Sequence, residues 1–272
     1  SETAFIDLPG AIGAVTVAGS YACVAAGEQG LHMVDISDPE YPALVGNYDS
    51  PGFTEDVAVA GSYAYVADGS EGLRVVDISD PYSPQEIGVY RTGTSYVESV
   101  AVSGNYAYLA DSLRGFRIVD ISDNTRPKKT GDLDVAGTSD GIDVSGDWVY
   151  IADGEGGLRI ITVEDKETPY EVHTYVTPGY AHAVVATVDR AYVADGTVLM
   201  ALPDANPDKL AAQVVSKVPL LIGSTRDEMT TLVPIDSKAH SARRLWPLFN
   251  GEPRDQTIGE QLGWWGAIKR HV

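Results

Sequence analysis

Short apolar runs, separated by turns rich in glycine, aspartate and proline, recur along the first 203 residues of the chain. Within residues 51–92, two such runs flank the turn Gly61-Ser62, and a third follows Asp68-Gly69 before a shorter fourth run. Apolar runs of this length between turn residues are typical of β-strands, and a two-residue turn between them is typical of a hairpin. The segment therefore predicts a small sheet of four antiparallel strands.

This pattern repeats with a period of 42 or 43 residues. Its marker is an aliphatic residue followed by alanine at the end of the second run, and the five markers begin at Val24, Val66, Leu109, Ile151 and Val193. Repeats of about 40 to 45 residues with four strands each are the blades of β-propellers. The sequence predicts an all-β, five-bladed β-propeller with repeats near residues 9–50, 51–92, 93–135, 136–177 and 178–203.

The fifth repeat lacks an apolar run in the place of a fourth strand. Residues 1–8 precede the first repeat, and residues 3–8 align with the fourth strand of the other repeats. Because an open sheet edge is an aggregation hazard, we expect this N-terminal segment to complete the last blade and close the ring.

The strings VADG and GLRVVDISDP, followed by G-x-Y, resemble the LVIVD-repeat propellers of bacterial and archaeal cell-surface and secreted proteins. The resemblance covers residues 1–203. It implies an extracytoplasmic propeller, secreted, periplasmic or at the cell surface, that is often an accessory module of a larger protein. It implies no catalytic motif, since a fold by itself does not define an activity.

The charge of the chain is concentrated in the repeats. The net charge is −20, and residues 1–203 hold 31 acidic against 10 basic side chains, whereas residues 204–272 hold 8 against 9. An acidic surface of this kind repels nucleic acid and favours cationic ligands and basic protein partners. No apolar run of about 18 residues is present, so we expect no membrane span.

One position in each repeat, two residues before the first valine of the innermost strand, varies in a way that turn geometry does not require. The residues there are Gly13, Glu55, Glu98, Asp140 and His182, and Asp56 follows Glu55. Connections of this type open on one face of a propeller, so we expect these side chains around the mouth of its channel. They form either a hydrated rim or a site for a ligand; the candidate ligand-binding residues are Glu55, Asp56, Glu98, Asp140 and His182.

Carboxylates beside an imidazole can bind a cationic ligand, or act as general acid and base. Glu98, Asp140 and His182 are therefore the candidate catalytic residues. The sequence holds no metal-ligand or cofactor motif, so no metal site is predicted, and a divalent cation held by carboxylate oxygens is the one cofactor that this rim could take. The repeated aspartates after the second strand are interpreted as turn residues, because Asp-Gly favours a tight turn.

The repeats end near Leu202, and residues 204–272 predict a mixed or helical extension that packs on the propeller or on a partner. Residues 208–217 predict a short helix. Residues 218–228 are similar to the VPLLIGTTRDE segment of type-B carboxylesterases, and this resemblance aligns Glu228 with the acid of a catalytic triad. A G-x-S-x-G string containing Ser139 lies in a blade connection, not in the strand-turn-helix elbow that activates a serine.

Aromatic residues cluster near the C-terminus, at Trp246, Phe249, Trp264 and Trp265. They either pack within the chain or form an interface for a partner or a second copy, since tryptophan is enriched at interfaces.

Three functions remain open from the sequence. The first is a non-catalytic binding or scaffold propeller that presents an acidic face to a ligand or protein partner. The second is a lyase or hydrolase with its active site at the propeller mouth. The third is a carboxylesterase-like hydrolase that would use Ser139, Glu228 and a histidine.

Overall fold

The computed structural model describes residues 4–203 except 113, 136, 188, 189 and 197, together with residues 221–222 and 231–232. The chain divides into two compact units, Ser1–Pro207 and Asp208–Val272. In the second unit, β20 (Leu221–Ile222) pairs antiparallel with β21 (Thr231–Leu232). The helix expected at 208–217, Glu228 and the C-terminal aromatic residues lie outside the described residues.

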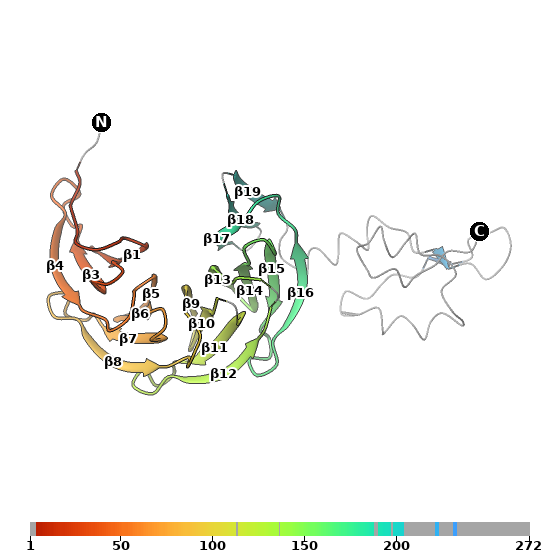
Figure 1. Ribbon diagram of the computed structural model, residues 1–272, viewed down its shortest axis with the longest axis horizontal. Coiled ribbons are helices and arrows are strands. Elements are labelled where there is room, and N and C mark those ends of the chain that lie inside the picture. The colour runs from red at the N-terminus through yellow and green to blue at the C-terminus, as the bar shows by residue number, and fades with distance from the viewer. Residues whose placement is uncertain are drawn as a thin grey trace. The chain divides into compact units, whose positions relative to one another are not determined.

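Five antiparallel sheets, formed one after another along the chain, make up the first unit (Figure 1). The first and second sheets contain β1 (Ala14–Ala18), β2 (Tyr21–Ala25), β3 (Leu31–Asp35), β4 (Ala43–Tyr48), β5 (Asp56–Ala60), β6 (Tyr63–Ala67), β7 (Leu73–Asp77) and β8 (Gln85–Tyr90). The third and fourth contain β9 (Ser99–Ser103), β10 (Tyr106–Ala110), β11 (Phe116–Asp120), β12 (Lys128–Leu133), β13 (Gly141–Ser145), β14 (Trp148–Ala152), β15 (Leu158–Thr162) and β16 (Tyr170–Tyr175). The fifth contains β17 (Ala181–Ala186), β18 (Arg190–Asp195) and β19 (Val198–Pro203). The prediction of an all-β, five-bladed propeller is confirmed.

The first strand of each sheet lies nearest the centre, and the fourth strands β4, β8, β12 and β16 lie outermost (Figure 1). Hairpin turns between the first and second strands use glycines in the left-handed region, as at Gly61 and Gly104, with φ of 61° and 58°. Residues with side chains rarely adopt this backbone conformation, which explains why glycine recurs there.

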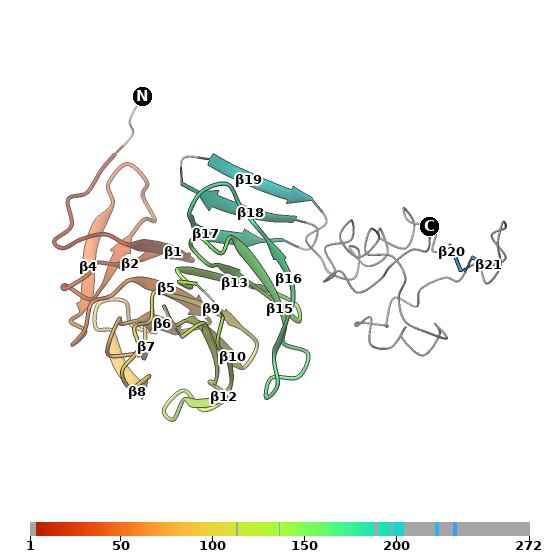
Figure 2. The same cartoon turned by 45° about the vertical axis from the view of Figure 1, so that its right-hand side comes forward.

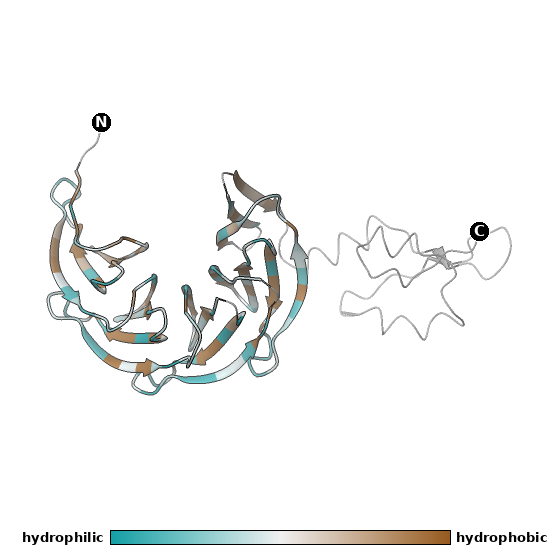
Figure 3. Cartoon of the chain, in the orientation of Figure 1, coloured by the Kyte–Doolittle hydropathy of each residue, from teal (hydrophilic) through white to brown (hydrophobic). Residues whose placement is uncertain are grey.

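The core lies between neighbouring blades rather than at the centre of the molecule. One apolar cluster joins each consecutive pair of blades, and each contains buried residues from both partners. Figure 3 shows the same distribution, with apolar residues in the strands and hydrophilic residues in many of the outer loops. Each blade therefore depends on its neighbours to bury its faces.

The expected closure by the N-terminal segment is wrong. Residues 4–8 form no strand, and the fifth sheet has the three strands β17, β18 and β19 (Figure 2). Ile6 and Leu8 instead pack on the first blade, against the cluster of Ala22, Val24 and Val34, while Phe5 is exposed. The physical reason is local: the first blade has no preceding neighbour, and the segment attached to it covers part of its free apolar face.

Candidate functional site: an acidic rim

The acidic rim is formed by Glu55, Glu98, Asp140 and His182, which come from four successive blades. The backbone N–H of Glu55 donates to Ala67 O at 2.9 Å, and those of Glu98 and Asp140 make the equivalent bonds to Ala110 and Ala152 at 3.0 Å. These side chains therefore start from equivalent points, directly before the innermost strands β5, β9 and β13. His182 lies inside β17, at an irregularity of the pairing between Ala181 and Ala183.

The carboxylates of the rim lie close enough to affect one another. The pKa of Glu98 is raised to about 7, mainly by burial and further by the negative charges of Glu55 and Asp140. Among the described residues, no lysine or arginine forms an ion pair with any of these three side chains. These three carboxylates thus lie near one another without a lysine or arginine to balance their charge.

His182, the member of the rim on the fifth blade, lies beside a carboxylate and a tyrosine. His182 Nδ1 lies 3.9 Å from Asp140 Oδ2, and the His182 side chain is 59% exposed against 26% for Asp140. The Tyr180 ring lies beside the imidazole, with 4.7 Å between ring centroids. The exposure of His182 leaves its imidazole open to a ligand beside the Asp140 carboxylate.

Tyrosine also contributes on the third blade, which sequence reasoning missed. The Tyr96 hydroxyl donates to Glu55 Oε1 and so fixes this carboxylate from the neighbouring blade. Aligning the repeats with one another could have identified this tyrosine. Phe53, Tyr96 and Tyr180 occupy one position of the repeat, two residues before the rim residue of their blade. This position places an aromatic ring beside a glycine of the preceding blade, as Tyr96 does at Gly69.

Asp56, the remaining predicted ligand-binding residue, uses its carboxylate to join two blades. Its Oδ2 accepts hydrogen bonds from Ser99 Oγ at 2.6 Å and from Val100 N at 3.0 Å, and its Oδ1 accepts one from its neighbour Val57 N. These bonds give Asp56 a structural role between the second and third blades.

The serine of the G-x-S-x-G string is inaccessible. Ser139 is fully buried, its backbone pairs with Ser112, and its hydroxyl lies 3.5 Å from Asp153 Oδ1. No described histidine donates to or accepts from its hydroxyl. Ser139 therefore belongs to the packing of the fourth blade.

Comparison with known proteins gives the fold family. The LVIVD-repeat family model matches residues 9–50, 51–92, 95–135 and 136–177. The chain belongs to the LVIVD-repeat family. No curated protein sequence matches this LVIVD-repeat chain.

Two solved structures are similar to the LVIVD-repeat propeller. The computationally designed Ika8 protein has a TM-score of 0.57 at 10% identity, and the match covers 71% of this chain and 58% of that one. The computationally designed Ika4 protein has a TM-score of 0.49 at 10% identity, covering 57% of this chain and 92% of that one. The LVIVD-repeat chain thus spans little more than half the length of Ika8, and the likeness extends to fold alone.

The repeated aspartates of the LVIVD blades have a role beyond the turn. Asp68 is completely buried, and its Oδ2 accepts from Arg74 Nε at 3.1 Å. The third and fourth blades contain the same pair; the partners there are Asp111 with Arg117 and Asp153 with Arg159. The aspartate and arginine are six residues apart in each case, which is the signal that the sequence offered.

Two LVIVD blades depart from this pairing. In the first, Ala26 and His32 replace aspartate and arginine together. In the fifth, Asp195 is buried and accepts from Gly179 N at 2.9 Å, but Met200 occupies the place of the arginine. The first blade lacks both members of the pair, so no unpaired aspartate is buried there. The fifth blade lacks only the arginine, so a backbone N–H hydrogen-bonds to its buried carboxylate instead.

The described residues contain no helix long and apolar enough to cross a membrane. Within the same part of the chain, no group of three or more histidine, cysteine, aspartate or glutamate side chains is arranged to hold a metal ion.

Proposed function

We propose that this LVIVD-repeat propeller is a non-catalytic binding scaffold whose acidic rim takes a cationic group of a small molecule or protein partner. The observation that carries the proposal is the state of Glu98, a partly buried carboxyl group with a pKa of about 7 between two other carboxylates. Ionising this group costs free energy in the unliganded protein, and a bound cation would offset that cost. Binding energy is therefore available to a cationic ligand.

The proposal predicts how affinity depends on pH. Below pH 7 Glu98 holds a proton and contributes no charge, whereas above pH 7 it is ionised and attracts a cation. Since the cation favours the ionised form, binding at pH 6 must release a proton. Affinity should therefore rise from pH 5.5 to pH 8.

Isothermal titration with L-arginine amide tests the proposal. At pH 8, Glu98→Gln should weaken binding by about tenfold, the equivalent of about 1.4 kcal/mol. Glu40→Gln is the matched control, because Glu40 is an exposed residue in the loop between β3 and β4 and its substitution changes the net charge equally. Equal loss in the two variants, or no binding by the wild-type protein, would contradict the proposal.

A second candidate function, a lyase or hydrolase, is favoured by the pair of His182 and Asp140 beside Glu98. A carboxyl group with a pKa near 7 can donate a proton at neutral pH, and an imidazole can accept one. In this case p-nitrophenyl ester and glycoside substrates should reveal a turnover that falls by about 10²-fold in His182→Ala. A turnover that His182→Ala leaves unchanged would exclude this active site.

A further inference from the structure

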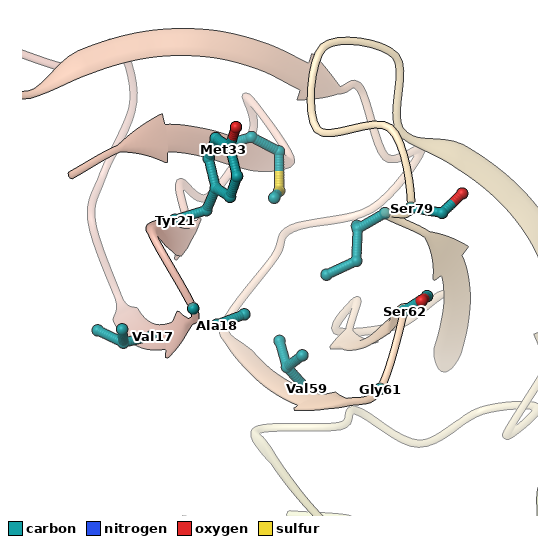
Figure 4. A pocket seen from close by; sticks show the side chains of 10 residues that line it. Val17, Ala18, Tyr21, Met33, Val59, Gly61, Ser62 and Ser79 are labelled. Atoms are coloured by element: carbon teal, nitrogen blue, oxygen red, sulfur yellow. The ribbon is translucent and has the colours of Figure 1, made fainter. Parts of the chain in front are cut away.

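A cavity of about 470 Å³ lies between the first and second blades. Its wall includes Ala18, Tyr21 and Met33 from the first blade and Val59 and Ile78 from the second. Figure 4 shows the labelled side chains of Met33 and Tyr21 on one side and those of Val59 and Ser62 on another. The cavity lies at the ends of β1 and β5 that lead into the hairpin turns, whereas Glu55 precedes the start of β5. It is therefore separate from the acidic rim.

At the other three blade interfaces, a tyrosine ring occupies the corresponding position. Tyr65, Tyr108 and Tyr150 lie at the centre of the second strand of their blades, and all three are buried. The equivalent residue of the first blade is Cys23. Since a cysteine side chain is much smaller than a hydroxyphenyl ring, the first interface lacks the group that fills the others.

The surroundings of Tyr65 match the wall of the cavity residue by residue. The counterparts of the five wall residues named above are Ala60, Tyr63, Val75, Val102 and Ile121. All five pack in the same apolar cluster as Tyr65. The cavity thus lies in the part of the first interface that corresponds to the surroundings of Tyr65 in the second.

Met33 fills only part of this space. It stands opposite Cys23 in the pairing of β2 with β3, where the second, third and fourth blades have valine or isoleucine. The two sulfur atoms lie 3.7 Å apart. Methionine is longer than valine and adapts to irregular gaps, yet the cavity remains beside it. Cys23 itself is fully buried, and burial raises the pKa of its thiol to about 11, so it offers no reactive thiolate.

We propose that this interblade cavity binds the hydroxyphenyl group of a small molecule. The apolar side chains of Met33, Val59 and Ile78 would contact the ring, since their counterparts pack in the same cluster as Tyr65. The Tyr65 hydroxyl donates to Asn124 Oδ1 at 2.9 Å, and the residues that line the cavity include Ser62 and Ser79. The size of the cavity falls in the range of small-molecule sites.

p-Cresol, which is the tyrosine side chain as a free molecule, is the probe. Saturation-transfer NMR should show binding with a Kd on the order of 1 mM, as expected for so small a ligand. Toluene, which lacks the hydroxyl, should bind more weakly, and equal affinity would overturn the choice of a hydroxyphenyl group.

Two substitutions at Cys23 locate the site. Cys23→Tyr should weaken p-cresol binding at least about tenfold because the new ring fills the cavity, whereas Cys23→Ala should leave affinity within about twofold. Val59→Phe provides a second obstruction of the cavity should Cys23→Tyr fail to fold. The proposal is overturned if the wild-type protein shows no binding at about 10 mM p-cresol, or if a folded obstructed variant binds as well as wild type.

Discussion

At the scale of single residues, the buried charges of the second, third and fourth blades are tolerated because aspartate and arginine pair with each other. Arg74 is 2% exposed and forms ion pairs with Asp68, Glu71 and Glu86. This one side chain therefore links the turn between β6 and β7 to the fourth strand of the blade, β8. A buried ion pair adds little net stability, but removing one member leaves an unpaired buried charge. The first blade, with Ala26 and His32, shows that the repeat can do without the pair.

Replacing Arg74 alone should therefore be more damaging than replacing both partners. We expect Arg74→Met to lower the free energy of unfolding by about 3–5 kcal/mol, and Asp68→Ala in the same chain to recover most of that loss. Urea unfolding measures both. If the double variant loses as much free energy of unfolding as the two single variants together, lost packing, not the unpaired carboxylate, is responsible for the destabilisation.

Glu98 gives a second prediction at this scale. Its pKa is raised from 4.5 to about 7 by folding, so the folded state binds its proton more tightly than the unfolded chain. The contribution of protonated Glu98 to the free energy of unfolding is fully present below about pH 4.5 and is lost as the pH rises through about 7. Glu98→Gln should match the wild-type melting temperature at pH 4.5 and exceed it at pH 8. The same difference between the two proteins at both pH values would contradict the raised pKa.

At the scale of elements, the fourth strands require glycine where the next blade approaches them. A Cβ on Gly131 of β12 would lie 2.2 Å from Lys166 O, and a Cβ on Gly88 of β8 would lie 2.0 Å from Asn124 O. Backbone atoms cannot move aside as a flexible side chain would. In β16 the equivalent residue is His173, which already carries a side chain and contacts the Tyr175 ring.

Gly131→Ala should consequently cost about 1–3 kcal/mol, as overpacking of a close contact does. The matched substitution His173→Ala should cost about 1 kcal/mol or less, because it removes an exposed side chain with one ring contact. Chemical denaturation of the two variants gives the comparison. Equal losses in the free energy of unfolding would show that β12 and the backbone of Lys166 move apart without destabilising the protein.

At the scale of the molecule, burial depends on whether a blade has a neighbour. Val15 and Val57 occupy the same position of the innermost strand, yet Val15 is 61% exposed and Val57 is 2% exposed. The first blade lacks a preceding blade, and the arc in Figure 1 is open between the first and fifth blades. At the other end Leu199 is 72% exposed, whereas its counterpart Leu73 is fully buried.

Equivalent substitutions at this repeat position should have unequal effects. Val57→Thr buries a hydroxyl in the interface of the first two blades and should cost about 1–3 kcal/mol. Val15→Thr should change stability by no more than about 0.5 kcal/mol, since the side chain already contacts water. A large loss for Val15→Thr in urea unfolding would mean that the first blade is covered in solution.

The sequence by itself determined the strands, the turns and the number of blades, because each follows from local periodicity and from residues such as Gly61 that fix a backbone conformation. It also placed Glu55, Glu98 and Asp140 at one repeat position. The tertiary structure decided everything that depends on the neighbouring blade: the raised pKa of Glu98, the bond from Tyr96 to Glu55, the packing of Ile6 and Leu8 on the first blade, and the cavity between the first and second blades. A linear pattern specifies how one blade pairs within itself, whereas burial and electrostatic coupling arise only when two blades lie face to face.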